Sequence, residues 1–143
     1  DAKPRMFGFQ AANAAPLVDG APVKNPQTVA TAIRIGNPAS WDGAISAVKE
    51  SNGHIGKVTD EEILASYKLV AGTEGVFAEP ACAAPLAGLI HCVRDGIIPI
   101  GSRIVVTLTG HGLKDSDAAI SVAGAEPKVV EPDLDAVKRV IGL

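Results

Sequence analysis

Aromatic residues are scarce in this chain of 143 residues and make up only 3% of it. The hydrophobic content of 47% must therefore pack mainly as Ala, Val, Ile and Leu. Small aliphatic side chains suit helices that pack closely on a sheet, so the composition favours an α/β fold over an all-β sandwich. The length is usual for one domain, and we expect a single globular unit over residues 1–143.

An excess of positive charge and long hydrophobic runs are also lacking. The net charge is −3, and no cluster of Lys and Arg has aromatic residues between its members. This pattern excludes nucleic acid and anionic membrane surfaces as main partners. No apolar run approaches the roughly 20 residues of a membrane-spanning helix, and no basic start is followed by the apolar stretch of a secretion signal. We therefore expect a soluble protein.

Cysteine is rare, with only Cys82 and Cys92 present. The two lie in one predicted helix, whose geometry turns them to different faces and separates them by roughly 15 Å of helix rise. They should not form a disulfide, and two unpaired cysteines without a secretion signal favour a cytoplasmic location. No group of His, Cys, Asp and Glu has the spacing of a zinc site, so we predict no structural metal.

Extended and helical segments alternate along the chain. This alternation predicts an α/β fold with a mostly parallel sheet flanked by helices and connected by right-handed crossovers. The predicted extended segments are residues 4–10, 55–58, 76–78, 104–108 and 127–132. The predicted helices are residues 28–35, 41–51, a helix that begins after Thr59, and residues 81–95, 116–121 and 134–141.

Two helix starts have clear capping signals. Thr59 and Glu62 have the spacing of a capping box, in which the hydroxyl and the carboxylate each satisfy a free amide of the first turn. Asp133 precedes the apolar stripe of the last helix and is suited to cap it.

A β-branched run over residues 104–108 ends abruptly in Thr109-Gly110-His111-Gly112. A buried strand that ends in this way delivers polar groups to the rim of a sheet, where ligands bind in open α/β folds. The two glycines would let the backbone approach a flat molecule. His111 could act as an acid or base, but we favour a role in ordering the loop. Lys114 and Asp115 are interpreted as a solvated pair.

Five segments together resemble threonine synthases, which are pyridoxal-phosphate enzymes of the tryptophan-synthase-like fold. They occur in the family's order and cover nearly the whole chain: PRMFGFQAANAAPLV at 4–18, TVATAIRIGNPASW at 28–41, VTDEEIL at 58–64, EGVFAEPACAAPLAGL at 74–89 and TLTGHGLKD at 107–115. The resemblance is to the last two fifths or so of the enzyme. It implies the carboxyl-terminal portion of the three-layer large domain, with residues 126–143 as a tail that holds the terminal helix.

The resemblance also implies a function. Threonine synthases are lyases that use pyridoxal 5'-phosphate to convert O-phospho-L-homoserine and water to L-threonine and phosphate. The intact enzyme is expected to be a cytoplasmic homodimer. The Schiff-base lysine and the glycine-rich phosphate-binding loop belong to the missing amino-terminal part, so we assign no catalytic residue here and expect the isolated chain to be inactive. The lysines at 24, 49, 57, 68 and 128 have polar surroundings that would not lower an amine's pKa enough.

Two cofactor-binding residues are implied by the resemblance. Thr109 matches the residue that contacts the pyridine nitrogen of pyridoxal phosphate, and a hydroxyl can only donate to an unprotonated nitrogen. A hydroxyl that closes a strand-end turn is the alternative. Ala32 matches a position against one face of the cofactor ring, where little more than a methyl group fits; an ordinary small residue at a helix contact is equally compatible with it. Arg34 could reach an anionic group, although we favour a solvated arginine.

Cys82 departs from the family pattern. It stands where a serine is usual in the family's Glu-Pro-Ala-Ser turn. A thiol donates a weaker hydrogen bond than a hydroxyl, so a contact normally made by that serine is in doubt. Pro85 and His91 lie on the same predicted helix and are interpreted as structural.

Two other functions remain open from the sequence. A threonine or serine dehydratase would share the fold and the contact to the pyridine nitrogen, but ATAIRIGNP and LTGHGLKD favour the synthase. A non-catalytic binding or interaction module could instead pair through an exposed sheet edge.

Overall fold

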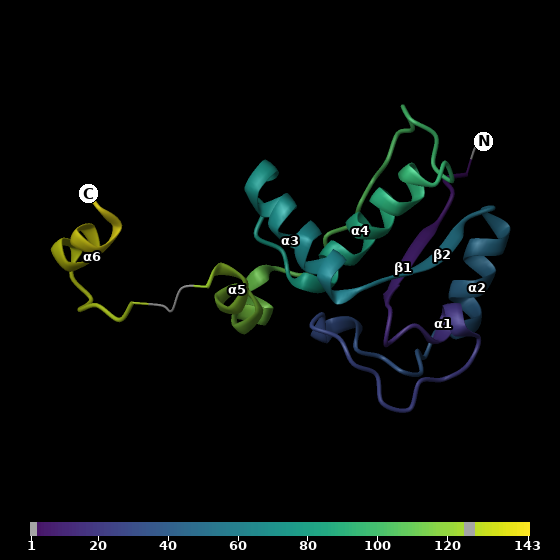
Figure 1. Ribbon diagram of the computed structural model, residues 1–143, viewed down its shortest axis with the longest axis horizontal. Helices are drawn as coiled ribbons and strands as arrows, with labels where there is room; N and C mark the ends of the chain where they lie inside the picture. The colour runs from purple at the N-terminus through teal and green to yellow at the C-terminus, as the bar shows by residue number, and fades with distance from the viewer. Residues whose placement is uncertain (1–2, 125–127) are drawn as a thin grey trace.

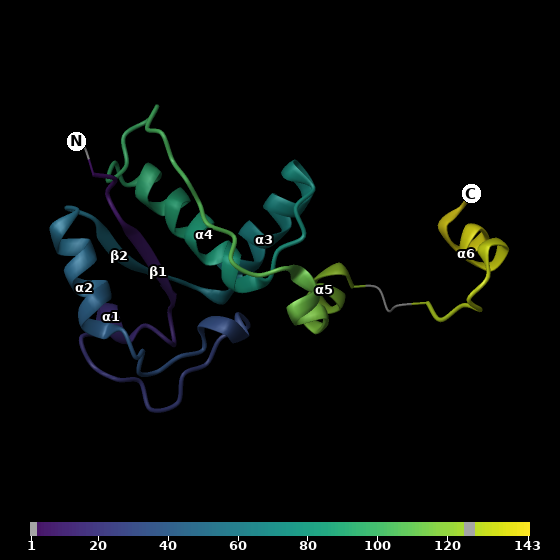
Figure 2. The ribbon, with the colours of Figure 1, turned by 180° about the vertical axis from the view of Figure 1, so that it is seen from behind.

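The computed structural model describes residues 3–124 and 128–143 (Figure 1). Its sheet has two parallel strands, β1 (Phe7–Ala11) and β2 (His54–Val58), which pair from Phe7 with His54 to Ala11 with Val58. Figures 1 and 2 show α3 and α4 on one side of this sheet and α1 and α2 on the other. The predicted α/β class, with helices flanking a parallel sheet, is confirmed, although the sheet is smaller than the alternation predicted.

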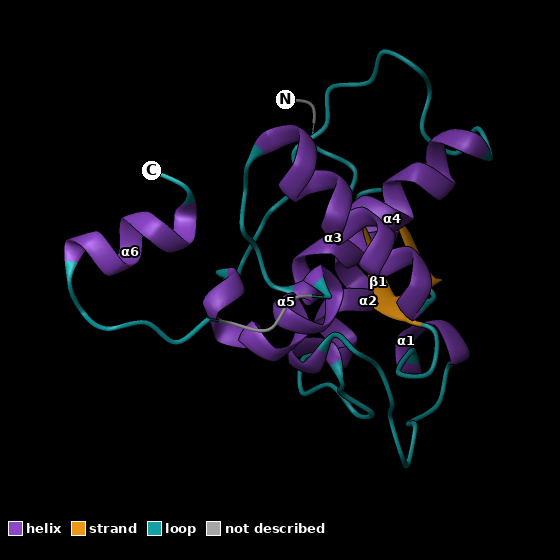
Figure 3. Cartoon of the chain, turned by 60° about the vertical axis from the view of Figure 1, so that its left-hand side comes forward, coloured by secondary structure: helices purple, strands orange, loops and turns teal. Residues whose placement is uncertain are grey.

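Four helices form the layers around the sheet. They are α1 (Pro16–Asp19), α2 (Trp41–Glu50), α3 (Asp60–Glu74) and α4 (Pro80–Arg94). Helix α3 packs along α4, and α4 lies across both strands (Figure 3). The core is built mainly from alanines, as the composition predicts, together with three larger side chains: Ala11, Ala14, Ala30, Val58, Ile63, Tyr67, Ala83, Ala84 and Ala87.

The capping box at the start of α3 is confirmed. The Thr59 hydroxyl accepts from the Glu62 amide at 3.3 Å, and the Glu62 carboxylate accepts from the Thr59 amide at 2.8 Å. At the other end of the chain, Asp133 Oδ1 accepts from the Asp135 and Ala136 amides and caps α6 (Leu134–Ile141) as predicted. Both signals act over two or three residues, which is why they can be recognised from sequence.

Several predicted extended segments are wrong. Residues 104–108 form a loop that runs past α4 (Figure 2), with Val105 89% exposed. Residues 76–78 contribute only an isolated bridge between Ala78 and His111. Residue 127 lies outside the described residues, and residues 128–132 are not a strand. A β-branched run becomes a strand only beside a hydrogen-bonding neighbour, and within the described chain residues 104–108 have none.

The predicted helix over residues 28–35 is also wrong. Only a short 3₁₀ turn, η1 (Thr31–Ile33), forms there. Side-chain hydrogen bonds hold the segment in another conformation: the Val29 amide donates to Asp60 at 3.1 Å, and Arg34 donates to the Thr28 carbonyl, an acceptor that a helix would use. These side-chain bonds, one of them from the distant Asp60, therefore override the local pattern.

The carboxyl-terminal residues form η2 (Gly112–Asp115), α5 (Ser116–Ala123) and α6. Figure 1 shows α6 apart from the other elements, and its Leu134 and Ile141 are 68% and 61% exposed. Within the described ranges, no helix combines the length and apolar character needed to cross a membrane.

Candidate functional site

The loop that carries Thr109 lies against the amino end of α4. The Glu79 amide donates to the Gly110 carbonyl at 3.0 Å, and the Gly112 amide donates to the Phe77 carbonyl at 3.0 Å. These backbone bonds join the segment before α4 to the segment after residue 108. Thr109 is thereby held beside the first turn of α4 while its side chain remains exposed.

The Cys82 thiol joins α4 to the same loop. Its Sγ accepts from the Gly110 amide at 3.1 Å and lies 3.5 Å from the Gly110 carbonyl oxygen and 3.7 Å from Thr109 Oγ1. Cys82 is buried, so this contact is shielded from water. The structure thus brings Cys82 and Thr109 together across 27 positions of sequence.

At both glycines of the loop, the Cα atom lies close to another side chain of the protein. A Cβ on Gly110 would lie 1.9 Å from Glu79 Oε1, and one on Gly112 would lie 2.3 Å from the Phe77 ring. The expectation that these glycines leave room for a flat molecule is therefore wrong for their Cα positions. They allow the loop to pack closely on the segment that leads into α4.

Ala32 lies on η1 and is exposed. The neighbouring Thr31 hydroxyl donates to Asp115 Oδ2 at 3.0 Å, and Asp115 also caps α5 by accepting from the Ala118 amide at 3.3 Å. The segment with Ala32 is thus connected to the segment that follows Thr109. The interpretation of Asp115 as one of a solvated pair is wrong. Its position just before a predicted helix was a capping signal that could have identified part of its role.

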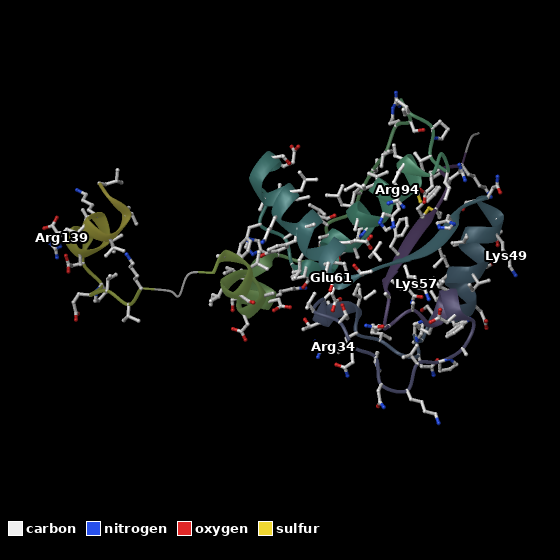
Figure 4. The ribbon with its side chains drawn as sticks, in the orientation of Figure 1. Arg34, Lys49, Lys57, Glu61, Arg94 and Arg139 are labelled. Atoms are coloured by element: carbon white, nitrogen blue, oxygen red, sulfur yellow. The ribbon has the colours of Figure 1, made fainter. Side chains whose placement is uncertain are left out.

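Arg34 also stabilises the segment that contains Ala32. Its Nε and Nη2 donate to the Thr28 carbonyl oxygen at 3.1 and 2.6 Å, and Thr28 Oγ1 bonds Asp60 at the start of α3. Figure 4 shows Arg34 near the loop before α2 and below Glu61. Arg34 is exposed, as expected from the sequence, and its guanidinium also bonds the protein backbone.

The histidines of this region have packing partners. His111 Nδ1 accepts from the Leu113 amide at 3.1 Å, and its ring meets the Phe77 ring edge-on at 5.5 Å. This geometry supports the role in ordering the loop. His91, on α4, lies with Nε2 2.7 Å from Glu62 Oε1 on α3, which agrees with its structural interpretation.

The cavity at this site is small. It has a volume of about 10 Å³ and is lined by side chains that include Tyr67, Glu79, Cys82 and Leu108. That volume holds little more than one water molecule. This cavity therefore does not enclose a ring-sized ligand.

The chemistry of the exposed groups fits one end of pyridoxal phosphate. Thr109 offers a hydroxyl donor suited to an unprotonated pyridine nitrogen, and Ala32 offers a methyl group suited to the face of a ring. The five lysines considered from sequence are all exposed, and Figure 4 labels two of them, Lys49 and Lys57. Lys57 pairs with Asp19 at 2.8 Å. In the part of the chain that the structure describes, His, Cys, Asp and Glu do not gather in a group that could hold a metal ion.

Comparison with known proteins gives a consistent result. A family model described as "Pyridoxal-phosphate dependent enzyme" matches residues 1–110. Curated threonine synthases are similar over most of the chain. That of Synechocystis sp. is 50% identical over 143 residues, with 99% of this chain and 37% of the relative covered. That of Mycobacterium tuberculosis is 54% identical over 133 residues, with 92% and 37% covered.

A solved structure supports the fold. The crystal structure of a threonine deaminase from T.th. superposes with a TM-score of 0.52 at 22% identity, covering 73% of this chain and 39% of that one. At this identity the likeness concerns the fold alone. The chain spans less than two fifths of the length of the curated relatives described above.

Proposed function

This chain belongs to the family of pyridoxal-phosphate-dependent enzymes, and we propose that it is the carboxyl-terminal part of a threonine synthase. The observation that carries the proposal is the identity of 50–54% to threonine synthases over nearly the whole chain. The complete enzyme would convert O-phospho-L-homoserine and water to L-threonine and phosphate. It would be a lyase, and its remaining length would supply the groups that this chain lacks.

Thr109 would hold the pyridine nitrogen of the cofactor. When bound, pyridoxal phosphate supplies an electron sink, and the partner of its nitrogen sets how strongly it withdraws electrons. A carboxylate would keep the nitrogen protonated, whereas the Thr109 hydroxyl would donate to the unprotonated form and give a milder sink. The support is that Thr109 is exposed at the amino end of α4 while its backbone neighbour Gly110 is fixed there.

Ala32 would form part of the wall against the cofactor ring. Its methyl group is exposed on η1, so a ring could lie against it at van der Waals distance. The bond from Thr31 to Asp115 would hold this wall in place relative to the loop of Thr109. Both residues orient the ring, and neither transfers a proton in this proposal.

The covalent chemistry would come from the rest of the enzyme. The lysines considered from sequence are all exposed at the surface and do not line the site of Thr109 and Ala32 with a buried amine. We therefore expect the 143-residue chain by itself to form no threonine. The complete protein would work as a homodimer in the cytoplasm, where the free thiols of Cys82 and Cys92 would stay reduced.

The test uses the full-length polypeptide that contains this chain. Its visible spectrum with pyridoxal phosphate should change when O-phospho-L-homoserine is added, and threonine and phosphate should form in equal amounts. L-threonine and L-serine serve as the control substrates, because a dehydratase would convert them to 2-oxo acids. If the native polypeptide had only this length and stayed colourless with pyridoxal phosphate, the proposal would be wrong and a binding module would take its place.

A further inference from the structure

We propose that Cys82 is a positioning residue that orients the Thr109 hydroxyl toward the cofactor nitrogen. The inference rests on the proposed function, since it gives Thr109 a cofactor to contact. It goes further because it assigns to a thiol of α4 the orientation of the Thr109 hydroxyl proton. Cys82 itself would touch neither substrate nor cofactor.

The first step is the placement of the thiol. Cys82 is 2% exposed and is the third residue of α4, which begins at Pro80. Its Sγ lies 3.7 Å from Thr109 Oγ1, within reach of a hydrogen bond to sulfur. Because the thiol itself is buried, it is a fixed neighbour for the side of the hydroxyl that faces α4.

The second step is the direction of that bond. The Gly110 amide already donates to Sγ at 3.1 Å, so the sulfur acts as acceptor on that side. Its single proton can then point to the Gly110 carbonyl oxygen at 3.5 Å or to Thr109 Oγ1 at 3.7 Å. When Thr109 donates its own proton to the cofactor, its oxygen is free to accept, and the thiol proton turns to it.

The third step is the rigidity of the loop that carries Thr109. The Glu79 amide donates to the Gly110 carbonyl at 3.0 Å and the Gly110 amide donates to Cys82 Sγ, so both backbone polar groups of the residue after Thr109 are held. A Cβ on Gly110 would meet the Glu79 carboxylate, which shows how closely this loop is packed. The backbone of the loop thus stays in place, and the remaining freedom is the rotation of the Thr109 hydroxyl. Cys82 restricts that rotation.

The experiment measures cofactor binding by the full-length enzyme. Cys82→Ala should weaken the binding of pyridoxal phosphate by about three- to ten-fold, which is the effect of losing the bond to the Thr109 hydroxyl. Cys82→Ser restores a donor and acceptor and should bind within about two-fold of the wild type. Cys92→Ala is the matched control, because Cys92 is equally buried on α4; it should lower the melting temperature and leave cofactor affinity unchanged.

A double-mutant cycle tests the route through Thr109. In a Thr109→Val background there is no hydroxyl to orient, so Cys82→Ala should have no further effect on cofactor affinity. If Cys82→Ala weakened binding equally in both backgrounds, or if Cys82→Ser failed to restore it, the inference would be overturned.

A second measurement needs no substitution at Cys82. Infrared difference spectra of the wild-type enzyme should show a shifted S–H stretching band when the cofactor binds, and the shift should disappear in Thr109→Val saturated with cofactor. A wild-type band that does not move would overturn the inference even if Cys82→Ala failed to fold. Threonine formation by the wild type is followed in the same preparation. Its absence would count against the proposed function, whereas cofactor affinity and the S–H band would still decide the role of Cys82.

Discussion

His91 Nε2 lies 2.7 Å from Glu62 Oε1 and links α4 to α3 through a carboxylate that is already part of the capping box. The other oxygen, Glu62 Oε2, accepts from the Thr59 amide at 2.8 Å. One side chain therefore both satisfies a free backbone amide at the start of α3 and joins the two helices that support the core. Because both interactions use the charged carboxylate, protonation of Glu62 should weaken them and lower the stability of the fold.

Glu62 should contribute a pH-dependent part of the stability of the full-length enzyme. The hydrogen bond from the Thr59 amide, opposed by burial and assisted by His91, holds the pKa of Glu62 below its usual value of 4.5. The contribution is complete above that value and is lost as the pH falls through the lower folded pKa. Glu62→Gln keeps a capping acceptor but loses the charge. It should lower the free energy of unfolding at neutral pH by less than about 1 kcal/mol, because the side chain is partly exposed.

Melting temperatures measured from neutral pH into the acid range check this expectation. The wild type should lose stability more steeply than Glu62→Gln as the acid range is entered. Glu74→Gln, at the other end of α3, is the control and should follow the wild type. Equal slopes for the wild type and Glu62→Gln would contradict the prediction.

Thr59→Ala should destabilise the enzyme by about 1 kcal/mol, because the Glu62 amide loses its capping acceptor. Thr59→Ser should retain most of the stability. Thr73→Ala is a useful control, since its hydroxyl only bonds the Leu69 carbonyl near the end of the same helix. Urea unfolding followed by circular dichroism measures all three, and a Thr73→Ala loss as large as that of Thr59→Ala would count against the capping argument.

Gly110→Ala should destabilise the enzyme by about 1–3 kcal/mol, because its Cβ would overlap the Glu79 carboxylate and force the loop away from α4. The same substitution should weaken cofactor binding, since Thr109 moves with the loop. Gly72→Ala is the control: it lies inside α3 with open space around it and should be neutral or stabilising by up to about 1 kcal/mol. Thermal unfolding and cofactor titration distinguish the two, and a Gly110→Ala enzyme with unchanged affinity would place Thr109 outside the site.

Thr109→Asp should change the electronic state of the bound cofactor. A carboxylate beside the pyridine nitrogen favours its protonated form, so the visible spectrum should respond to pH differently from that of the wild type. Threonine formation should fall on the order of ten-fold or more, as expected when a tuned hydrogen bond is lost. Thr107→Asp, two residues earlier on the exposed loop, is the matched control. Identical spectra for Thr109→Asp and the wild type would show that another residue meets the nitrogen.

Features that depend on neighbours a few residues apart could be predicted from the sequence alone. The capping box of Thr59 and Glu62, the Asp133 cap and the helices α2 to α6 were predicted because caps and apolar stripes act within one or two turns. Thr109, Ala32 and the cofactor were indicated by the resemblance to threonine synthases, and the family match bears out the cofactor.

The way distant segments meet depends instead on tertiary packing. Residues 104–108 have strand propensity but no hydrogen-bonding neighbour in the described chain, so they remain a loop. The contacts of Thr31 with Asp115 and of Cys82 with Gly110 join positions 84 and 28 residues apart. Such contacts depend on the packing of α4 against the sheet and on which loops it brings together. No local pattern of residues encodes that outcome, because the partners become neighbours only after the chain has folded.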